Sequence, residues 1–140
     1  MAIELLIPSR HELPNDADDL ADLYNELSEA VDDFRLDEKI RKGTPRGQLA
    51  SLKFLSQKLD DQAKLLRTDE IREKLSLIQA EIVRIRTAAA DAKVQFGLLN
   101  DAGAAIAIAD AGLGAATAIT AGKAEIVTRA VDAFVRAAAV

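Results

Sequence analysis

The chain has no cysteine, no tryptophan and only one histidine among its 140 residues. The absence of cysteine excludes a disulfide framework, a thiolate metal site and a catalytic thiol. Zinc sites need several His or Cys ligands, and a Ser-His-Asp triad needs a histidine held beside a serine. The single histidine, His11, lies in the N-terminal segment, so we predict no catalytic residue, no metal site and no cofactor.

Proline, glycine and aromatic side chains are also scarce. The chain has three prolines and seven glycines, which are too few for a turn-rich all-β protein. Four phenylalanines and one tyrosine supply all the large rings, so the core has to be built from Leu, Ile, Val and Ala. These residues are typical of closely packed helices. The composition therefore predicts an all-α protein in which residues 1–140 form a single domain.

The N-terminus lacks the basic region and the long apolar run of a secretory signal peptide. We therefore expect a cytoplasmic protein, and the sequence leaves export by another route open. Residues 1–14 contain Pro8 and Pro14, which disfavour a continuous helix. We predict that this segment is an extended arm, which either lies along the helices or docks on a neighbour.

A concentrated basic surface, the main signature of nucleic-acid binding, is missing as well. Residues 1–40 contain 12 acids and 3 bases, whereas residues 41–100 contain 7 acids and 12 bases. The bases of the middle segment are spread along its whole length and are not interleaved with aromatic residues. We therefore expect a protein partner and no nucleic acid.

An apolar pattern that begins at Leu20 predicts the first helix, from about Asn15 to Gly43. The pattern leaves a row of acids on the outer face of this helix, namely Asp22, Glu26, Glu29, Asp32 and Asp33. These acids either pair with the bases of the middle segment or form an acidic face for a basic partner. A weaker hypothesis is a magnesium site like that of helical pyrophosphohydrolases, which would need a second acidic pair such as Glu70 and Glu73.

The longest apolar pattern lies between Thr68 and Leu99. Nine successive heptad positions are apolar there: Ile71, Leu75, Ile78, Ile82, Ile85, Ala89, Ala92, Phe96 and Leu99. They predict one long helix from about Asp69 to Leu99. The spacing changes at Thr68, so the preceding helix, which starts near Pro45, either ends there or continues with a local phase shift.

Residues 102–122 contain a single charge, Asp110, and are mostly alanine, glycine, isoleucine and threonine. This segment is a buried helix with close neighbours, a self-association surface or a membrane-inserting helix, since about 20 residues cross a bilayer. Asp110 and the weak hydrophobicity of alanine and glycine disfavour insertion. A long heptad helix followed by such a segment is similar in pattern, although in no motif, to α-helical pore-forming toxins.

Together these patterns predict an elongated, mainly antiparallel bundle of four or five helices. We expect a non-enzymatic interaction protein, such as an adaptor, inhibitor or assembly factor, that is oligomeric and acts by helix–helix burial. The residues expected at the interaction surface are Ile71, Leu75, Ile78, Ile82, Ile85, Phe96, Leu99, Ile106, Leu113 and Ile119. The alternatives are a membrane-active or pore-forming protein that uses residues 102–122 and, more weakly, a metal-dependent all-α hydrolase.

Overall fold

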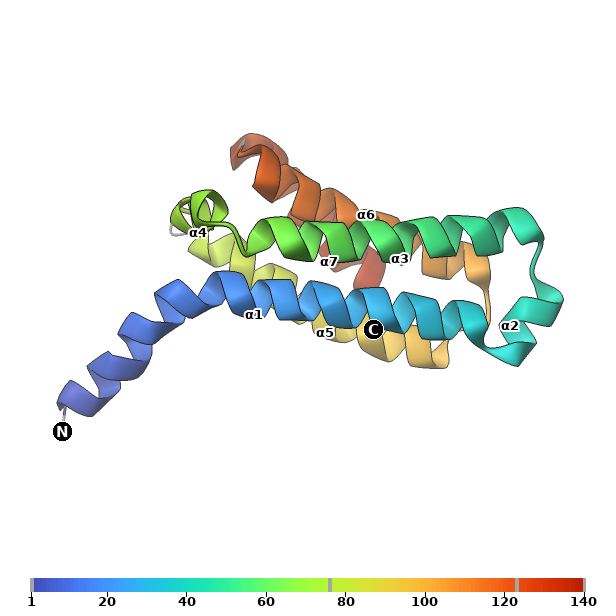
Figure 1. Ribbon diagram of the computed structural model, residues 1–140, viewed down its shortest axis with the longest axis horizontal. Coiled ribbons are helices and arrows are strands. Elements are labelled where there is room, and N and C mark those ends of the chain that lie inside the picture. Colours follow the sequence, from blue (N-terminus) through green and yellow to red (C-terminus); the bar gives the residue numbers. More distant parts are fainter. Residues whose placement is uncertain (1, 76, 123, 140) are drawn as a thin grey trace.

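The protein is all-α. A computed structural model describes the backbone of residues 2–75, 77–122 and 124–139, and the side chains of residues 18–37, 40–71, 73–75, 77–122 and 125–139. Within these ranges the chain forms seven helices and no strand (Figure 1). The helices are α1 (Ala2–Leu36), α2 (Glu38–Gly43), α3 (Arg46–Leu66), α4 (Asp69–Leu75), α5 (Gln79–Leu98), α6 (Ala102–Ala121) and α7 (Ala124–Ala138).

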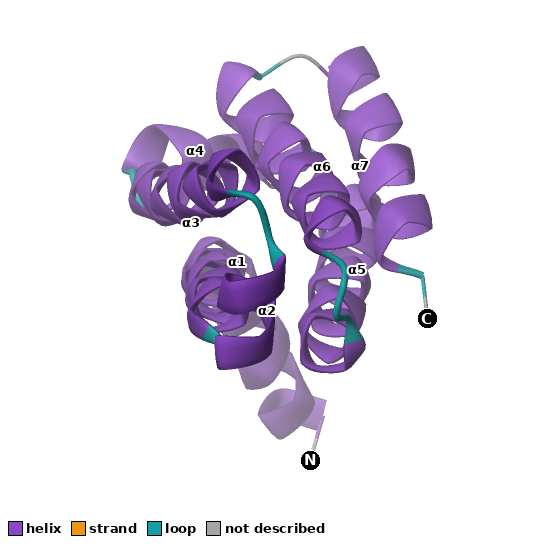
Figure 2. Ribbon diagram, turned by 90° about the vertical axis from the view of Figure 1, so that its right-hand side faces the viewer, coloured by secondary structure: helices purple, strands orange, loops and turns teal. Residues whose placement is uncertain are grey.

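The five longer helices form a closed ring around one apolar core. Helix α1 packs against α3 and α5, α3 against α6, α6 against α7, and α7 against α5. Figure 2 shows this ring from one end of the bundle. The two short helices, α2 and α4, belong to the connections at the ends.

Consecutive long helices run in opposite directions, as expected for a mainly antiparallel bundle. The lateral contacts between non-consecutive helices are parallel. Asp19 pairs with Arg86 and Glu26 pairs with Lys93, and both pairs are separated by 67 residues, which is possible only if α1 and α5 run in the same direction. Because directions alternate along the chain, α3 with α6 and α5 with α7 are parallel pairs too.

A reciprocal pair of buried serines joins α1 to α3. Ser28 Oγ donates a hydrogen bond to the Ser56 carbonyl at 2.7 Å, and Ser56 Oγ donates to the Ser28 carbonyl at 2.9 Å. Both side chains are buried. Their small size lets the two helix backbones approach closely, and their hydroxyls find partners without water.

We expect Ser28→Ala to lower the free energy of unfolding by about 1 kcal/mol, because one buried hydrogen bond is lost. Ser28→Ala with Ser56→Ala should cost less than the sum of the single losses, because the hydroxyls form one network. Urea unfolding followed by circular dichroism measures these losses. Ser51→Ala is the control, because Ser51 Oγ bonds the Gly47 carbonyl on the exposed surface. Strictly additive losses would contradict a shared network.

The prediction of an extended arm over residues 1–14 is wrong for the described residues 2–14, whose backbone is helical. Figure 1 shows this first part of α1 turned away from the bundle axis. A proline removes one helical hydrogen bond and bends a helix without always ending it. Arginine, glutamate and leucine, which lie between the prolines, favour the helical backbone. The side chain of His11 lies outside the described residues.

The predicted single helix over residues 69–99 is also wrong, because α4 ends at Leu75 and α5 begins at Gln79. The amide N–H groups of Leu77 and Ile78 bond carbonyls three residues back, at 3.0 and 3.2 Å, so the chain tightens there into turns. The heptad pattern could not reveal this break, because its apolar residues face the core on both sides of it. Of the two alternatives at Thr68, the structure shows the break, since α3 ends at Leu66 and α4 begins at Asp69.

Candidate interaction surfaces

The apolar residues predicted to meet a partner fill the chain's own core instead. Six of them are buried: Ile71, Leu75, Ile82, Ile85, Phe96 and Ile119. The other four, Ile78, Leu99, Ile106 and Leu113, are partly buried and pack against the core. The ring therefore closes this seam internally, and in this conformation the seam is not available to another protein.

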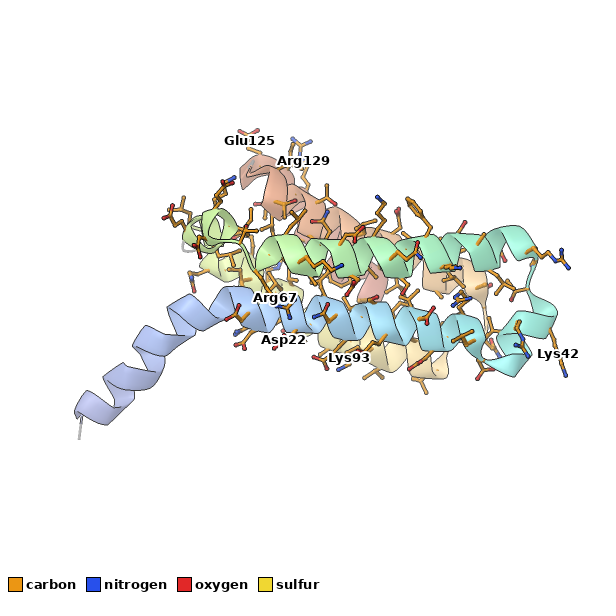
Figure 3. All side chains as sticks on the ribbon, viewed as in Figure 1. Asp22, Lys42, Arg67, Lys93, Glu125 and Arg129 are labelled. Carbon is orange, nitrogen blue, oxygen red and sulfur yellow. The ribbon has the colours of Figure 1, made fainter. Side chains whose placement is uncertain are left out.

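The acids of α1 mostly meet bases of the same chain. Asp22 accepts a hydrogen bond at 2.7 Å from Arg67, which directly follows α3 (Figure 3). Glu26 pairs with Lys93 of α5. Asp32 pairs with Arg35 of its own helix at 2.6 Å.

The two remaining acids of this row are exposed. Glu29 lies on the open side of α1, and Asp33 lines a cleft of about 560 Å³ between the ends of α1 and α5. Exposed ion pairs stabilise little individually. Here, however, three of the five acids in the row are paired with bases of the same chain. The arrangement favours pairing within the chain over a face kept for a basic partner.

The acids do not gather into a metal site in the part of the chain that the structure describes. No three His, Cys, Asp or Glu side chains there lie close enough together to hold an ion. Of the acids considered for a magnesium site, Glu26 of α1 is paired with Lys93 of α5. Glu73 lies on a different helix, α4.

Helix α6 attaches to the core through its inner face. The Tyr24 hydroxyl donates a hydrogen bond to the Gly112 carbonyl at 2.6 Å. A Cβ atom at Gly112 would lie 3.1 Å from the Phe134 ring, so only glycine fits there without a shift. Burial raises the pKa of Tyr24 well above its usual value, and outweighs the opposite effect of a hydrogen bond with the Ala116 backbone.

The ends of α6 are defined by capping residues. Asp101 accepts a hydrogen bond from the Gly103 backbone at 3.1 Å, and Gly122 ends the helix with φ of 75°. A left-handed residue at this position is the common helix stop that glycine provides.

Among the described residues α6 alone is long and apolar enough to cross a bilayer, and half of it is buried in the bundle.

An apolar stripe runs along the outer face of α5. Val83, Val94 and Leu98 are 60%, 51% and 72% exposed, and Thr87 and Ala90 between them are exposed as well. The spacing of four and three residues keeps this α5 stripe (Val83, Thr87, Ala90, Val94 and Leu98) on one side of the helix. It contains no charge over about four turns.

Charged pairs line both edges of the α5 stripe. Arg84 pairs with Asp132 of α7 on one edge, and Lys93 pairs with Glu26 of α1 on the other. An apolar centre with a polar rim is the usual anatomy of a protein interface.

No protein-family model, no curated protein and no solved structure matches the chain. The geometry of its surfaces therefore carries the functional argument alone.

Sequence reasoning missed the α5 stripe, although a signal was present. Val83, Ala90 and Val94 each fall one or two positions away from the predicted seam residues, so the helix is apolar on two sides. A helix that is apolar on all sides is typically buried on all sides, either within its own chain or against another molecule. In this ring α5 lies at the surface, and its second side remains open.

A second open surface lies between α3 and α6, on another side of the ring. One hollow, of about 410 Å³, lies between α3 and α6 beside Phe54. Another, of about 570 Å³, lies beside Leu65 and is also lined by Thr68 and the first residues of α4, among them Asp69 and Glu70. Phe54 is 55% exposed and Leu65 is 46% exposed. We call this surface the α3–α6 groove.

Proposed function

We propose that this protein is a non-enzymatic interaction protein, an adaptor or assembly factor, that binds an amphipathic helix of a partner protein along the α5 stripe. The observation that carries the proposal is the run of large apolar side chains on α5 that remain more than half exposed. Exposed apolar patches with polar rims mark interaction sites in soluble proteins. Apolar residues spaced by three and four positions, with charged edges, suit a partner helix that lies along the stripe.

The ion pairs beside the stripe support specificity rather than affinity. Two ion pairs lie at the edges of the α5 stripe, where a partner helix would carry charges of its own. They are Arg84 with Asp132 and Lys93 with Glu26. Rim charges mainly steer association and exclude wrong partners. We place the protein in the cytoplasm on the composition alone.

The membrane-active alternative keeps one supporting observation, the length and low charge of α6. Against it stand the contacts of its inner face, because Tyr24 and Phe134 hold Gly112 in the core. Insertion would have to break these contacts and carry Asp110 into the bilayer, at about 3 kcal/mol for the charge. If light scattering with anionic liposomes shows the protein transferred to lipid, the α5 proposal falls and α6 becomes the active element.

A photoreactive benzoylphenylalanine at Val94 tests the α5 proposal in the source cells. We expect it to form an adduct with one defined protein, because a partner helix covers this position. Ala133 is the control position, since it is exposed on α7 and lies off the stripe. Adding Val83→Lys should reduce the adduct at position 94 about tenfold, because a buried ammonium opposes docking.

Two results would contradict the proposal. One is the absence of any adduct at position 94. The other is an identical set of adducts at positions 94 and 133, which would show that the labelling reflects exposure and not docking.

A further inference from the structure

The outer face of α6 is made mostly of glycine and alanine, at positions that follow a heptad spacing. They are Gly103, Ala107, Asp110, Gly114, Thr117 and Ala121. Phe54 and Leu65 of α3 stand beside this face and leave the two hollows of the α3–α6 groove. The face is therefore flat on one side and lined by half-exposed apolar side chains on the other.

Gly114 is an exposed helical glycine with open space beside it, as Gly97 of α5 also is. Gly112 is needed for Phe134, and Gly103 lies against the capping carboxylate of Asp101. An added Cβ at Gly114 would meet nothing within 4 Å. Glycine in the middle of a helix costs about 1 kcal/mol relative to alanine. The space at Gly114 is thus left open at a cost in stability.

Two opposite charges on this surface have no ion-pair partner among the described side chains. Asp110 is the single charge of α6, and Lys58 of α3 lies over the Phe54 ring, with Nζ 5.3 Å from its centroid. Several charges elsewhere on the bundle form ion pairs, as Asp22 does with Arg67. A matching acid and base are therefore available on one face.

The register of the two helices places these charges to meet in a second copy. The Thr120 hydroxyl donates to Gln62 at 3.2 Å, which fixes α3 beside α6. Lys58 is one turn before Gln62 on this parallel pair, so it lies level with about Ala116, roughly 3 Å along the axis from Gly114.

If two copies of α6 cross in opposite directions about Gly112, each Asp110 falls opposite the partner copy's position 114. There glycine leaves room for the carboxylate, and Lys58 of that copy is within about one turn. Ala107 falls opposite Thr117 in the same arrangement. In the antiparallel arrangement the dipoles of the two helices also point in opposite directions, which is favourable.

We propose that the α3–α6 groove binds a second copy of this chain, with the two α6 helices antiparallel, Asp110 paired with Lys58 across the interface and Gly114 making room for it. The face measures about 30 Å along α6 and about 20 Å across two helices. It buries roughly 600 Å² per copy, which is at the lower end for a specific interface. The dimer is therefore concentration dependent. This proposal concerns a different face from the α5 stripe and does not rest on it.

Sedimentation of the intact chain over a range of concentrations is the first test. The wild type should dimerise, and Gly114→Leu should weaken the dimer at least about tenfold, because its side chain fills the space needed for the carboxylate. Gly97→Leu is the matched control, since Gly97 is an exposed helical glycine on α5 with equally open space. A monomer at every concentration, or equal effects of both substitutions, would overturn the proposal.

Charge reversal tests the pairing. Asp110→Lys and Lys58→Glu should each weaken the dimer by about tenfold, because two symmetric pairs turn into repulsions. The double variant should return to within about threefold of the wild type. A double variant as weak as the product of the single effects would overturn the proposed pairing.

The absence of cysteine permits a clean test of the register. Ala107→Cys with Thr117→Cys should give a disulfide-linked dimer under mild oxidation, because these positions face each other across copies. Each single variant should remain unlinked, since its own copies are about 15 Å apart along the axis. Linking of the single variants would indicate parallel helices and overturn the arrangement.

Discussion

Phe134→Ala will lower the free energy of unfolding by about 3–5 kcal/mol, the range for a large buried aromatic side chain. Phe134 is fully buried, and its ring lies against Gly112 in the middle of α6. Gly112 contributes no side chain that could fill the space that the ring leaves. A cavity that cannot collapse is the costly kind. Urea unfolding of the purified variant measures the loss.

Ile126→Ala is the control on the same helix, and it should cost less than about 1 kcal/mol because Ile126 is 46% exposed. The opposite change tests the same contact, since Gly112→Val forces a side chain against the ring and should cost about 1–3 kcal/mol. Losses below about 1 kcal/mol for both Phe134→Ala and Gly112→Val would show that α6 and α7 do not meet at this point.

The stability of the protein will fall steeply above pH 10, and Tyr24 is responsible for part of this fall. Burial raises the pKa of Tyr24 in the folded state above the ordinary tyrosine value of about 10. Below pH 10 the phenol is protonated in both states. Above it the unfolded chain releases the proton and the folded chain keeps it, so stability is lost by about 1.4 kcal/mol for each pH unit.

Tyr24→Phe separates this effect from the titration of lysines. The variant should lose less stability than the wild type over the same alkaline range, after a small loss at neutral pH from the missing hydrogen bond. Tyr24 is the single tyrosine of a chain without tryptophan, so tyrosinate absorbance reports this group alone. Tyrosinate that appears before the circular dichroism signal changes would mean that the hydroxyl is accessible in the folded state.

The helical class and the approximate extents of α3 and α6 could be predicted from the sequence, because composition and apolar spacing act locally. The first helix was predicted from about Asn15 to Gly43, but α1 begins at Ala2 and ends at Leu36. The seam from Ile71 to Leu99 marked true core positions, and the stop near Asn100 separates α5 from α6. The element that this seam packs against could not be predicted. A seam filled by a neighbouring helix of the same chain has the same periodicity as one filled by another subunit.

The apolar periodicity of the sequence could not predict the helix break after Leu75 or the open surfaces, and the reasons differ. The turn at Leu77 and Ile78 preserves the heptad phase, so the pattern passes through it unchanged. The exposure of Val94 and Leu98 depends on where α5 lies in the ring, which is a property of tertiary packing. The cost of Gly114 became visible only when the space around it was known.

The parallel contact between α1 and α5 has a consequence for the order in which the protein folds. The 67 residues between Glu26 and Lys93 must close as a loop before this contact exists, whereas α1 and α3 can pair early as a hairpin. A chain emerging from the ribosome has its N-terminal helices first. The hairpin of α6 and α7 is synthesised after the other helices of the ring, so Tyr24 gains its partner at Gly112 only after α6 has been made.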